Sequence, residues 1–98
     1  MNRQEIIAKL RENEGALRAR GISHVALFGS VARGEAGERS DIDLLVDLDP
    51  EVVRTIYDYA GVKCFIAELF ATPVDVVDRK GLKPHVLPTA VVDAINAF

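Results

Sequence analysis

The sequence has little sulfur, few aromatic residues and no long apolar run. One cysteine, Cys64, cannot form an internal disulfide, and no group of Cys and His residues has the spacing of zinc ligands. No apolar segment approaches the roughly 20 residues of a membrane-spanning helix, and the charged first segment is unlike a signal peptide. These absences argue against a disulfide framework, a zinc finger and a membrane protein, and they favour the cytoplasm.

Positive charge is also scarce and scattered. The chain carries 12 Lys and Arg residues against 15 Asp and Glu residues, which gives a formal net charge of −3. Tight binding to a phosphate backbone needs concentrated cations, so nucleic acid is not expected as the main partner. The 49% of hydrophobic residues is typical of a globular protein, and 98 residues allow one domain, 1–98. The core of so small a domain is limited, which favours a homo-oligomer or a partner chain.

The hydrophobic pattern predicts alternating helices and strands. A stripe of Ile6, Leu10 and Leu17 predicts a first helix, which Gly21 should end. Asp49 and Pro50 resemble the start of a middle helix. Its expected buried side is Ile56, Phe65, Ile66, Leu69 and Phe70, with Gly61 as a candidate interruption. The expected helices are 2–20, a segment that begins at 49–50, and a last segment from Thr89 to Phe98.

Three short apolar segments, 24–28, 42–48 and 73–77, are expected to form strands. In the second, Ile42, Leu44 and Val46 share one face, while Asp43 lies on the other. The element order predicts an α/β (α+β) fold with helices packed on a small mixed three-stranded sheet.

A glycine-serine turn follows the first expected strand. Gly29 permits close approach of a ligand to the backbone, and Ser30 offers a hydroxyl donor at a point where a short helix could begin. Such a turn suits a phosphate group. Taken alone, it is most often only a turn.

Three carboxylates form the second candidate feature. Asp41 and Asp43 are two residues apart, so their side chains share a strand face, roughly 6–7 Å apart at Cβ. That separation lets both reach one Mg²⁺ or a pair of ions about 3.5–4 Å apart. Asp75, on another expected strand, could supply a third metal ligand or a general base. Taken one by one, these acids would be read as a solvated strand face and a surface acid. Their combination with the glycine-serine turn favours a site.

The combined motif resembles a known family. Gly29-Ser-Val-Ala-Arg-Gly34, followed by Ser40-Asp-Ile-Asp-Leu44, is similar to the minimal nucleotidyltransferase (MNT) family of the DNA polymerase β superfamily. That family is marked by Gly-Ser, ten residues and Asp-x-Asp. The segment 73–77 resembles its third-acid strand, and the resemblance covers nearly the whole chain.

The resemblance implies a polymerase β-like fold and a set of site residues. Catalysis and metal binding are implied for Asp41, Asp43 and Asp75. Arg33 could neutralise the triphosphate, although a surface ion pair would explain it almost as well. Ser40 could fix the loop before the carboxylates, or be a plain loop serine. The expected nucleotide-binding residues are Gly29, Ser30, Arg33 and Ser40.

The function implied by the resemblance is Mg²⁺-dependent transfer of a nucleoside monophosphate, AMP first among them, from ATP or another NTP to a hydroxyl. Many family members are antitoxins of HEPN-domain toxins and act by binding the toxin, by adenylylating a tyrosine on it, or both. Two alternatives remain open. The chain could be a catalytically inactive antitoxin that acts by binding, or a plain NTP-binding sensor.

Other polar residues are given ordinary roles. Asp47 shares the face of Asp41 but lies further from the turn, and Asp78 is a weaker candidate than Asp75. His24 and His85 have no partner in the sequence that would make them catalytic.

Overall fold

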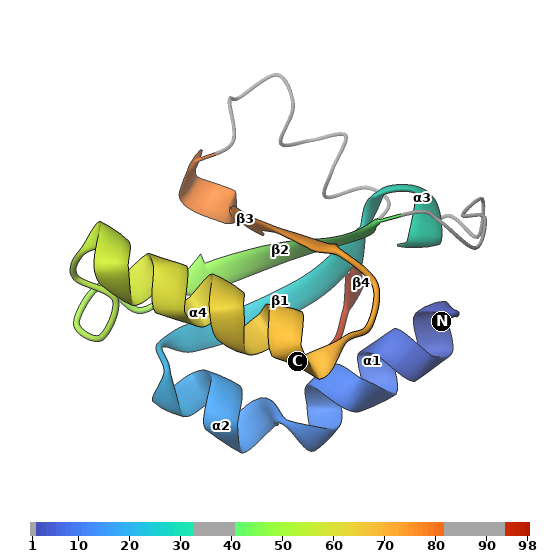
Figure 1. The fold of residues 1–98 in the computed structure, drawn as a ribbon, viewed down its shortest axis with the longest axis horizontal. Coiled ribbons are helices and arrows are strands. Elements are labelled where there is room, and N and C mark those ends of the chain that lie inside the picture. The colour runs from blue at the N-terminus through green and yellow to red at the C-terminus, as the bar shows by residue number, and fades with distance from the viewer. Residues whose placement is uncertain (1, 33–40, 82–93) are drawn as a thin grey trace.

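The computed structural model describes residues 2–32, 41–81 and 94–98. Helices and strands alternate along these segments (Figure 1). The elements are α1 (Arg3–Glu12), α2 (Glu14–Ala19), β1 (Ile22–Phe28), α3 (Gly29–Ala32), β2 (Ile42–Leu48), α4 (Ile56–Leu69), β3 (Val74–Asp78), the 3₁₀ turn η1 (Arg79–Gly81) and β4 (Ile95–Asn96).

The described strands form one mixed sheet in the order β3-β2-β1-β4. Strand β1 is antiparallel to both β2 and β4, whereas β2 and β3 run parallel. The expected α/β fold with a small mixed sheet is therefore confirmed. The expected number of three strands is wrong, because β4 adds a fourth.

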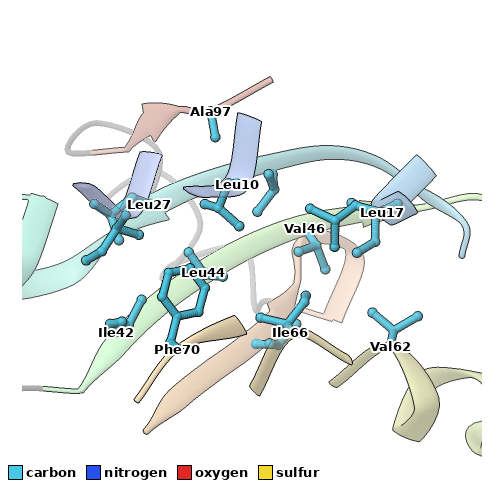
Figure 2. Close-up of a cluster of buried hydrophobic side chains, with 14 of the residues drawn as sticks. Leu10, Leu17, Leu27, Ile42, Leu44, Val46, Val62, Ile66, Phe70 and Ala97 are labelled. Atoms are coloured by element: carbon cyan, nitrogen blue, oxygen red, sulfur yellow. The ribbon is translucent and has the colours of Figure 1, made fainter. Parts of the chain in front are cut away.

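Helices α1, α2 and α4 lie on one face of this sheet and enclose the core (Figure 1). Figure 2 shows side chains of the helices meeting those of the central strands. Burial of such side chains is the main stabilising contribution to the fold. The fully buried side chains include Ile6, Leu10 and Leu17 from the helices and Leu27, Leu44 and Val46 from the strands.

The first helix is shorter than expected because Asn13 interrupts it. The Asn13 side chain donates to the carbonyl of Lys9 at 2.8 Å, and its backbone N–H donates to Leu10 at 3.2 Å. An asparagine that bonds to the preceding turn competes with the regular helical pattern. The predicted helix 2–20 is therefore two helices, α1 and α2, although Leu10 and Leu17 share one core as expected.

Gly21 ends α2, as the sequence predicts. Its φ of +100° is a conformation that residues with a Cβ rarely adopt. A methyl group at this position would also lie only 2.7 Å from Cγ2 of Val53. The chain then enters β1, so the glycine joins the helical layer to the sheet.

The start of the middle helix was predicted wrongly. Asp49 instead forms a turn, in which its side chain accepts a hydrogen bond from the Glu51 N–H at 2.9 Å. Helix α4 begins at Ile56, where Thr55 and Asp58 form a reciprocal capping box.

The buried side of α4 also differs from the expected one. Ile56 is 77% exposed, and Val62, which was not expected in the core, is buried. Ile66 and Phe70 are buried as expected, while Phe65 and Leu69 are partly buried against the core. Gly61 does not interrupt the helix, which runs through it without a break.

The prediction of a last helix over 89–98 is wrong for residues 94–98, the part of this segment that the structure describes. Ile95 and Asn96 form a strand that pairs with Leu27 and Ala26 of β1. The free edge of β1 offers backbone partners that no local pattern reveals, and Ala97 donates its N–H to the carbonyl of Val25 at 2.9 Å. Residues 82–93, including Pro84, His85, Pro88 and Thr89, lie outside the described residues, as does the expected loop 37–40. No helix in the described part of the chain is long and apolar enough to cross a membrane.

Candidate functional site

The predicted site residues are carried by elements that meet at one end of the sheet. Helix α3 follows directly on β1, and β2 and β3 begin at the same end because they run parallel (Figure 1). Gly29 is the first residue of α3 and Ser30 the second. The turn predicted from the glycine-serine pair is thus a single helical turn at the end of a central strand.

Gly29 and Asp43 are packed tightly together. Gly29 has φ +77°, and Asp43 lies on the neighbouring strand opposite Phe28, the residue just before the glycine. A methyl group at Gly29 would lie 3.1 Å from Cγ of Asp43 and closer still to its Oδ2. Glycine is therefore required here twice, for its backbone conformation and for the space that the carboxylate occupies.

The parallel pairing of β2 and β3 sets Asp43 directly beside Asp75. Neighbouring strands are about 4.8 Å apart, and residues in register share one face of the sheet. The next pair in register, Leu44 and Val76, is buried in the core, so both aspartates lie on the face away from that core. Asp43 is partly buried and Asp75 is exposed.

Asp41 lies just before β2 and is exposed. It is two residues from Asp43, so the expected Asp-x-Asp pair sits at the start of the strand. Within residues 2–32, 41–81 and 94–98, however, no three His, Cys, Asp or Glu side chains are close enough together to hold a metal ion. The strands bring the three acids to one end of the sheet, but the carboxylates are not gathered into a ready-made ligand set.

Two of the predicted nucleotide-binding residues, Arg33 and Ser40, fall outside the described residues. Gly29 and Ser30 are the predicted nucleotide-binding positions that the described segments include.

Two further aspartates, Asp47 and Asp78, have structural partners, which the sequence did not indicate. Asp47 Oδ1 lies 3.1 Å from Nε of Arg79, an ion pair without the angle of a hydrogen bond. Asp78 accepts a hydrogen bond from the backbone N–H of Lys80 at 3.1 Å and so stabilises the turn after β3. His24 Nδ1 lies 3.3 Å from the carbonyl oxygen of Phe98, a structural contact at the end of the chain.

Tyr59 of α4 forms a contact with β3 that the sequence did not reveal. Its hydroxyl donates to the carbonyl of Val76 on β3 at 3.2 Å. Burial raises the pKa of the Tyr59 phenol, and the negative charges of Asp78 and Asp75 add to the increase against an opposing hydrogen bond from the Asp78 backbone. No local pattern distinguishes Tyr59 from Tyr57, which is 82% exposed.

A hollow of about 310 Å³ lies away from these acids. Leu48 and Asp78, the last residues of β2 and β3, contribute to its wall, so it opens at the opposite end of the sheet. It is lined mostly by the turn before α4 and the first residues of that helix. The candidate site remains at Asp43 rather than in this hollow, because paired carboxylates can hold a metal ion, to which phosphate oxygens then bind.

Comparison with known proteins matches the motif to a family. The family model described as a nucleotidyltransferase domain matches residues 4–96. The chain belongs to the nucleotidyltransferase domain family. This confirms the resemblance inferred from Gly29-Ser30 and Asp41-x-Asp43, and the chain is accordingly an enzyme of the nucleotidyltransferase class.

This nucleotidyltransferase matches its relatives over most of their length. The protein adenylyltransferase MntA of Thermococcus cleftensis is 31% identical over 94% of this chain and 92% of its own. A solved structure provisionally assigned as a minimal nucleotidyltransferase has 36% identity and a TM-score of 0.72, over 97% of this chain and 95% of that one. A toxin–antitoxin crystal structure with AMP-PNP has a TM-score of 0.64 over 100% of this chain and 73% of that one. At 22% identity, this last likeness concerns the fold.

A nucleotidyltransferase fold implies a divalent metal, and the donor chemistry here fits Mg²⁺. All three candidate ligands are carboxylates, and Mg²⁺ prefers a few carboxylate oxygens together with water and phosphate oxygens. The missing side chain at Gly29 lets the Asp43 carboxylate lie directly against the backbone at the start of α3. Asp41, Asp43 and Asp75 are thus suitable in type and in strand position.

Proposed function

We propose that this nucleotidyltransferase moves a nucleoside monophosphate, AMP in the first instance, from an NTP to a hydroxyl group of a partner protein, with Mg²⁺. The observation that carries the proposal is the pairing of Asp43 with Asp75 beside Gly29. Two acids on adjacent strands, one of them packed against the Gly29 backbone, suit a metal ion that binds a triphosphate.

Each residue has a distinct role in this proposal. Gly29 and Ser30 bind the β- and γ-phosphates, Asp41 and Asp43 hold Mg²⁺, and Asp75 completes the site. Mg²⁺ supplies charge neutralisation at the phosphates and a lower pKa for the attacking hydroxyl. Arg33 and Ser40 remain proposed nucleotide-binding residues.

The proposed step is a displacement at the α-phosphorus. The acceptor oxygen forms a bond to this phosphorus, the bond from phosphorus to the bridging oxygen of the β-phosphate breaks, and pyrophosphate leaves. The acceptor proton passes to a carboxylate, for which Asp75 is the candidate.

The acceptor is proposed to be a tyrosine on a HEPN-domain toxin, which makes this chain its antitoxin. Two findings support a protein acceptor. The relative from Thermococcus cleftensis is named a protein adenylyltransferase, and a structure of the same fold is a toxin–antitoxin complex. A phenol, with a pKa near 10, loses its proton more easily than an aliphatic alcohol. The small core also favours a complex with the partner, or a homo-oligomer.

The test is co-expression with a candidate HEPN-domain partner, sought first in the neighbouring genes, followed by intact-mass measurement of that partner and a growth assay. The partner should gain the mass of one nucleoside monophosphate, and Asp41→Asn or Asp43→Asn should abolish the gain. Asp47→Asn is the matched control, because Asp47 belongs to the same strand but is paired with Arg79. The enzymatic proposal is refuted if the partner gains no mass while both acid variants still protect cells.

One observation favours a second candidate, an antitoxin that acts by binding alone. In the described part of the chain the carboxylates are not gathered into a three-ligand group. A binding module would keep the fold without needing that group. It predicts full protection by Asp41→Asn and Asp43→Asn, the outcome opposite to that of the enzyme.

A further inference from the structure

Helix α3 depends on a contact from a distant part of the chain. It consists of four residues, Gly29–Ala32, and the last carbonyls of a helix have no partner within it. The carbonyl of Ala32 accepts a hydrogen bond from Nη1 of Arg3 at 3.0 Å, across 29 residues of sequence. In Figure 1 the beginning of α1 lies at the same end of the molecule as α3.

Arg3 itself is held firmly. It is the first residue of α1, directly after Asn2, whose side chain caps the helix by accepting the Glu5 N–H at 2.9 Å. One turn later, Ile6 is fully buried in the core. The backbone of Arg3 is therefore anchored on both sides.

The electrostatic preference of helix α1 for charges near its ends does not explain an arginine at position 3. The first turn of a helix is the positive end of its dipole and disfavours a cation. The other arginine of α1, Arg11, lies in the last turn, where a cation is favoured. What Arg3 gains is its contact with Ala32.

We propose that Arg3 is a positioning residue of the nucleotide site. It holds the C-terminal end of α3, so that the Gly29–Ser30 backbone keeps its place beside Asp43. The inference rests on the proposed function, which assigns the triphosphate to Gly29 and Ser30.

The chain offers a matched control in Arg11. Its Nε donates to the carbonyl of Ala97 at 2.8 Å, so it too joins α1 to a distant backbone carbonyl across a partly buried contact. Ala97 follows β4 and belongs to the core, not to the candidate site. Arg3→Met and Arg11→Met therefore remove the same kind of bond, and only the first releases α3.

The experiment measures binding of Mg²⁺ with AMP-PNP by calorimetry for the wild type, Arg3→Met, Arg3→Lys and Arg11→Met. Arg3→Met should weaken binding about tenfold, equivalent to about 1.4 kcal/mol. Arg11→Met should stay within about twofold of the wild type, since a bond remote from the site affects stability rather than binding. Arg3→Lys should recover part of the loss, because one N–H donor is enough for the Ala32 carbonyl.

Amide hydrogen exchange supplies a readout that does not depend on nucleotide. Peptides that contain Gly29–Ala32 should exchange faster in Arg3→Met than in Arg11→Met, with little change elsewhere. Equal binding by wild type and Arg3→Met, or equal losses in Arg3→Met and Arg11→Met, would overturn the inference. Unchanged exchange in Gly29–Ala32 would overturn it as well.

Failure of the proposed function would look different. In that case the wild type would not bind Mg²⁺ with AMP-PNP, or Asp43→Asn would bind it equally well. If the wild type binds with dependence on Asp43 and Arg3→Met does so unchanged, only the role of Arg3 is refuted.

Discussion

Replacing Gly29 with alanine tests the most constrained point of the candidate site. At φ +77° an L-residue is strained by about 1–2 kcal/mol. The added methyl group would also displace the Asp43 side chain, at a cost of about 0.5–1.5 kcal/mol. The lower chain entropy of the unfolded alanine variant offsets about 0.4–1 kcal/mol of this. Gly29→Ala should therefore lower the free energy of unfolding by about 1–2 kcal/mol.

Thermal unfolding checks this value directly. For a domain of this size, 1 kcal/mol corresponds to about 4–8 °C in Tm, so Gly29→Ala should unfold about 5–15 °C below the wild type. Gly61→Ala is the control, because Gly61 lies within α4 and a methyl group there meets nothing within 4 Å. It should raise the free energy of unfolding by about 1 kcal/mol, the helix preference of alanine over glycine.

The two glycine variants should thus change the free energy of unfolding in opposite directions. A Gly29→Ala protein that unfolds at the wild-type temperature would refute the argument that the glycine conformation and the Asp43 carboxylate exclude a side chain. Because this variant displaces Asp43, it should also reduce the rise in Tm that the proposed function predicts on addition of Mg²⁺ with NTP.

Three further predictions concern helix α4. Ile66→Ala should lower the free energy of unfolding by about 2–5 kcal/mol, because Ile66 is fully buried. Ile56→Ala should cost little, because Ile56 is 77% exposed, and denaturant unfolding measures both variants. Tyr59→Phe should cost about 1 kcal/mol through the lost hydrogen bond to β3, with Tyr57→Phe as an exposed control. Since the folded pKa of Tyr59 is raised, its contribution to stability is present below pH 10 and lost as the pH rises further, and Tyr59→Phe should remove this alkaline dependence. Hydrogen bonds from backbone N–H groups lower the pKa of Asp58, so its contribution is present above pH 3.8 and is lost as the pH falls below that value; Asp58→Asn should flatten this acid dependence.

The central strand could be predicted from the sequence because local and tertiary preferences agree there. The alternation of apolar residues and aspartates in 42–48 gives both the bounds of β2 and the side to which Asp43 points. The Asp41-x-Asp43 spacing then places two acids at the start of one strand. A periodicity of two residues carries this information without knowledge of the rest of the fold.

The elements and contacts that could not be predicted depend either on competing local signals or on residues distant in the sequence. Two helix-start signals lie close together, and the capping box at Thr55 prevailed over Asp49 and Pro50. β4 forms because β1 has a free edge, which no pattern around Ile95 reveals. The contact of Arg3 with Ala32 depends on where α1 crosses the sheet, so its role could not be read from local sequence.

The position of the acids is coupled to the core through the register of the sheet. Leu44 and Val76 are adjacent to Asp43 and Asp75 in sequence, pair with each other, and are buried. A slip of one residue in either strand would expose its core side chain and turn its aspartate into the apolar layer. The cost of burying an unpaired carboxylate there would be large. The same hydrophobic contacts that stabilise the domain therefore hold Asp43 and Asp75 side by side on the opposite face, where the proposed nucleotide site lies.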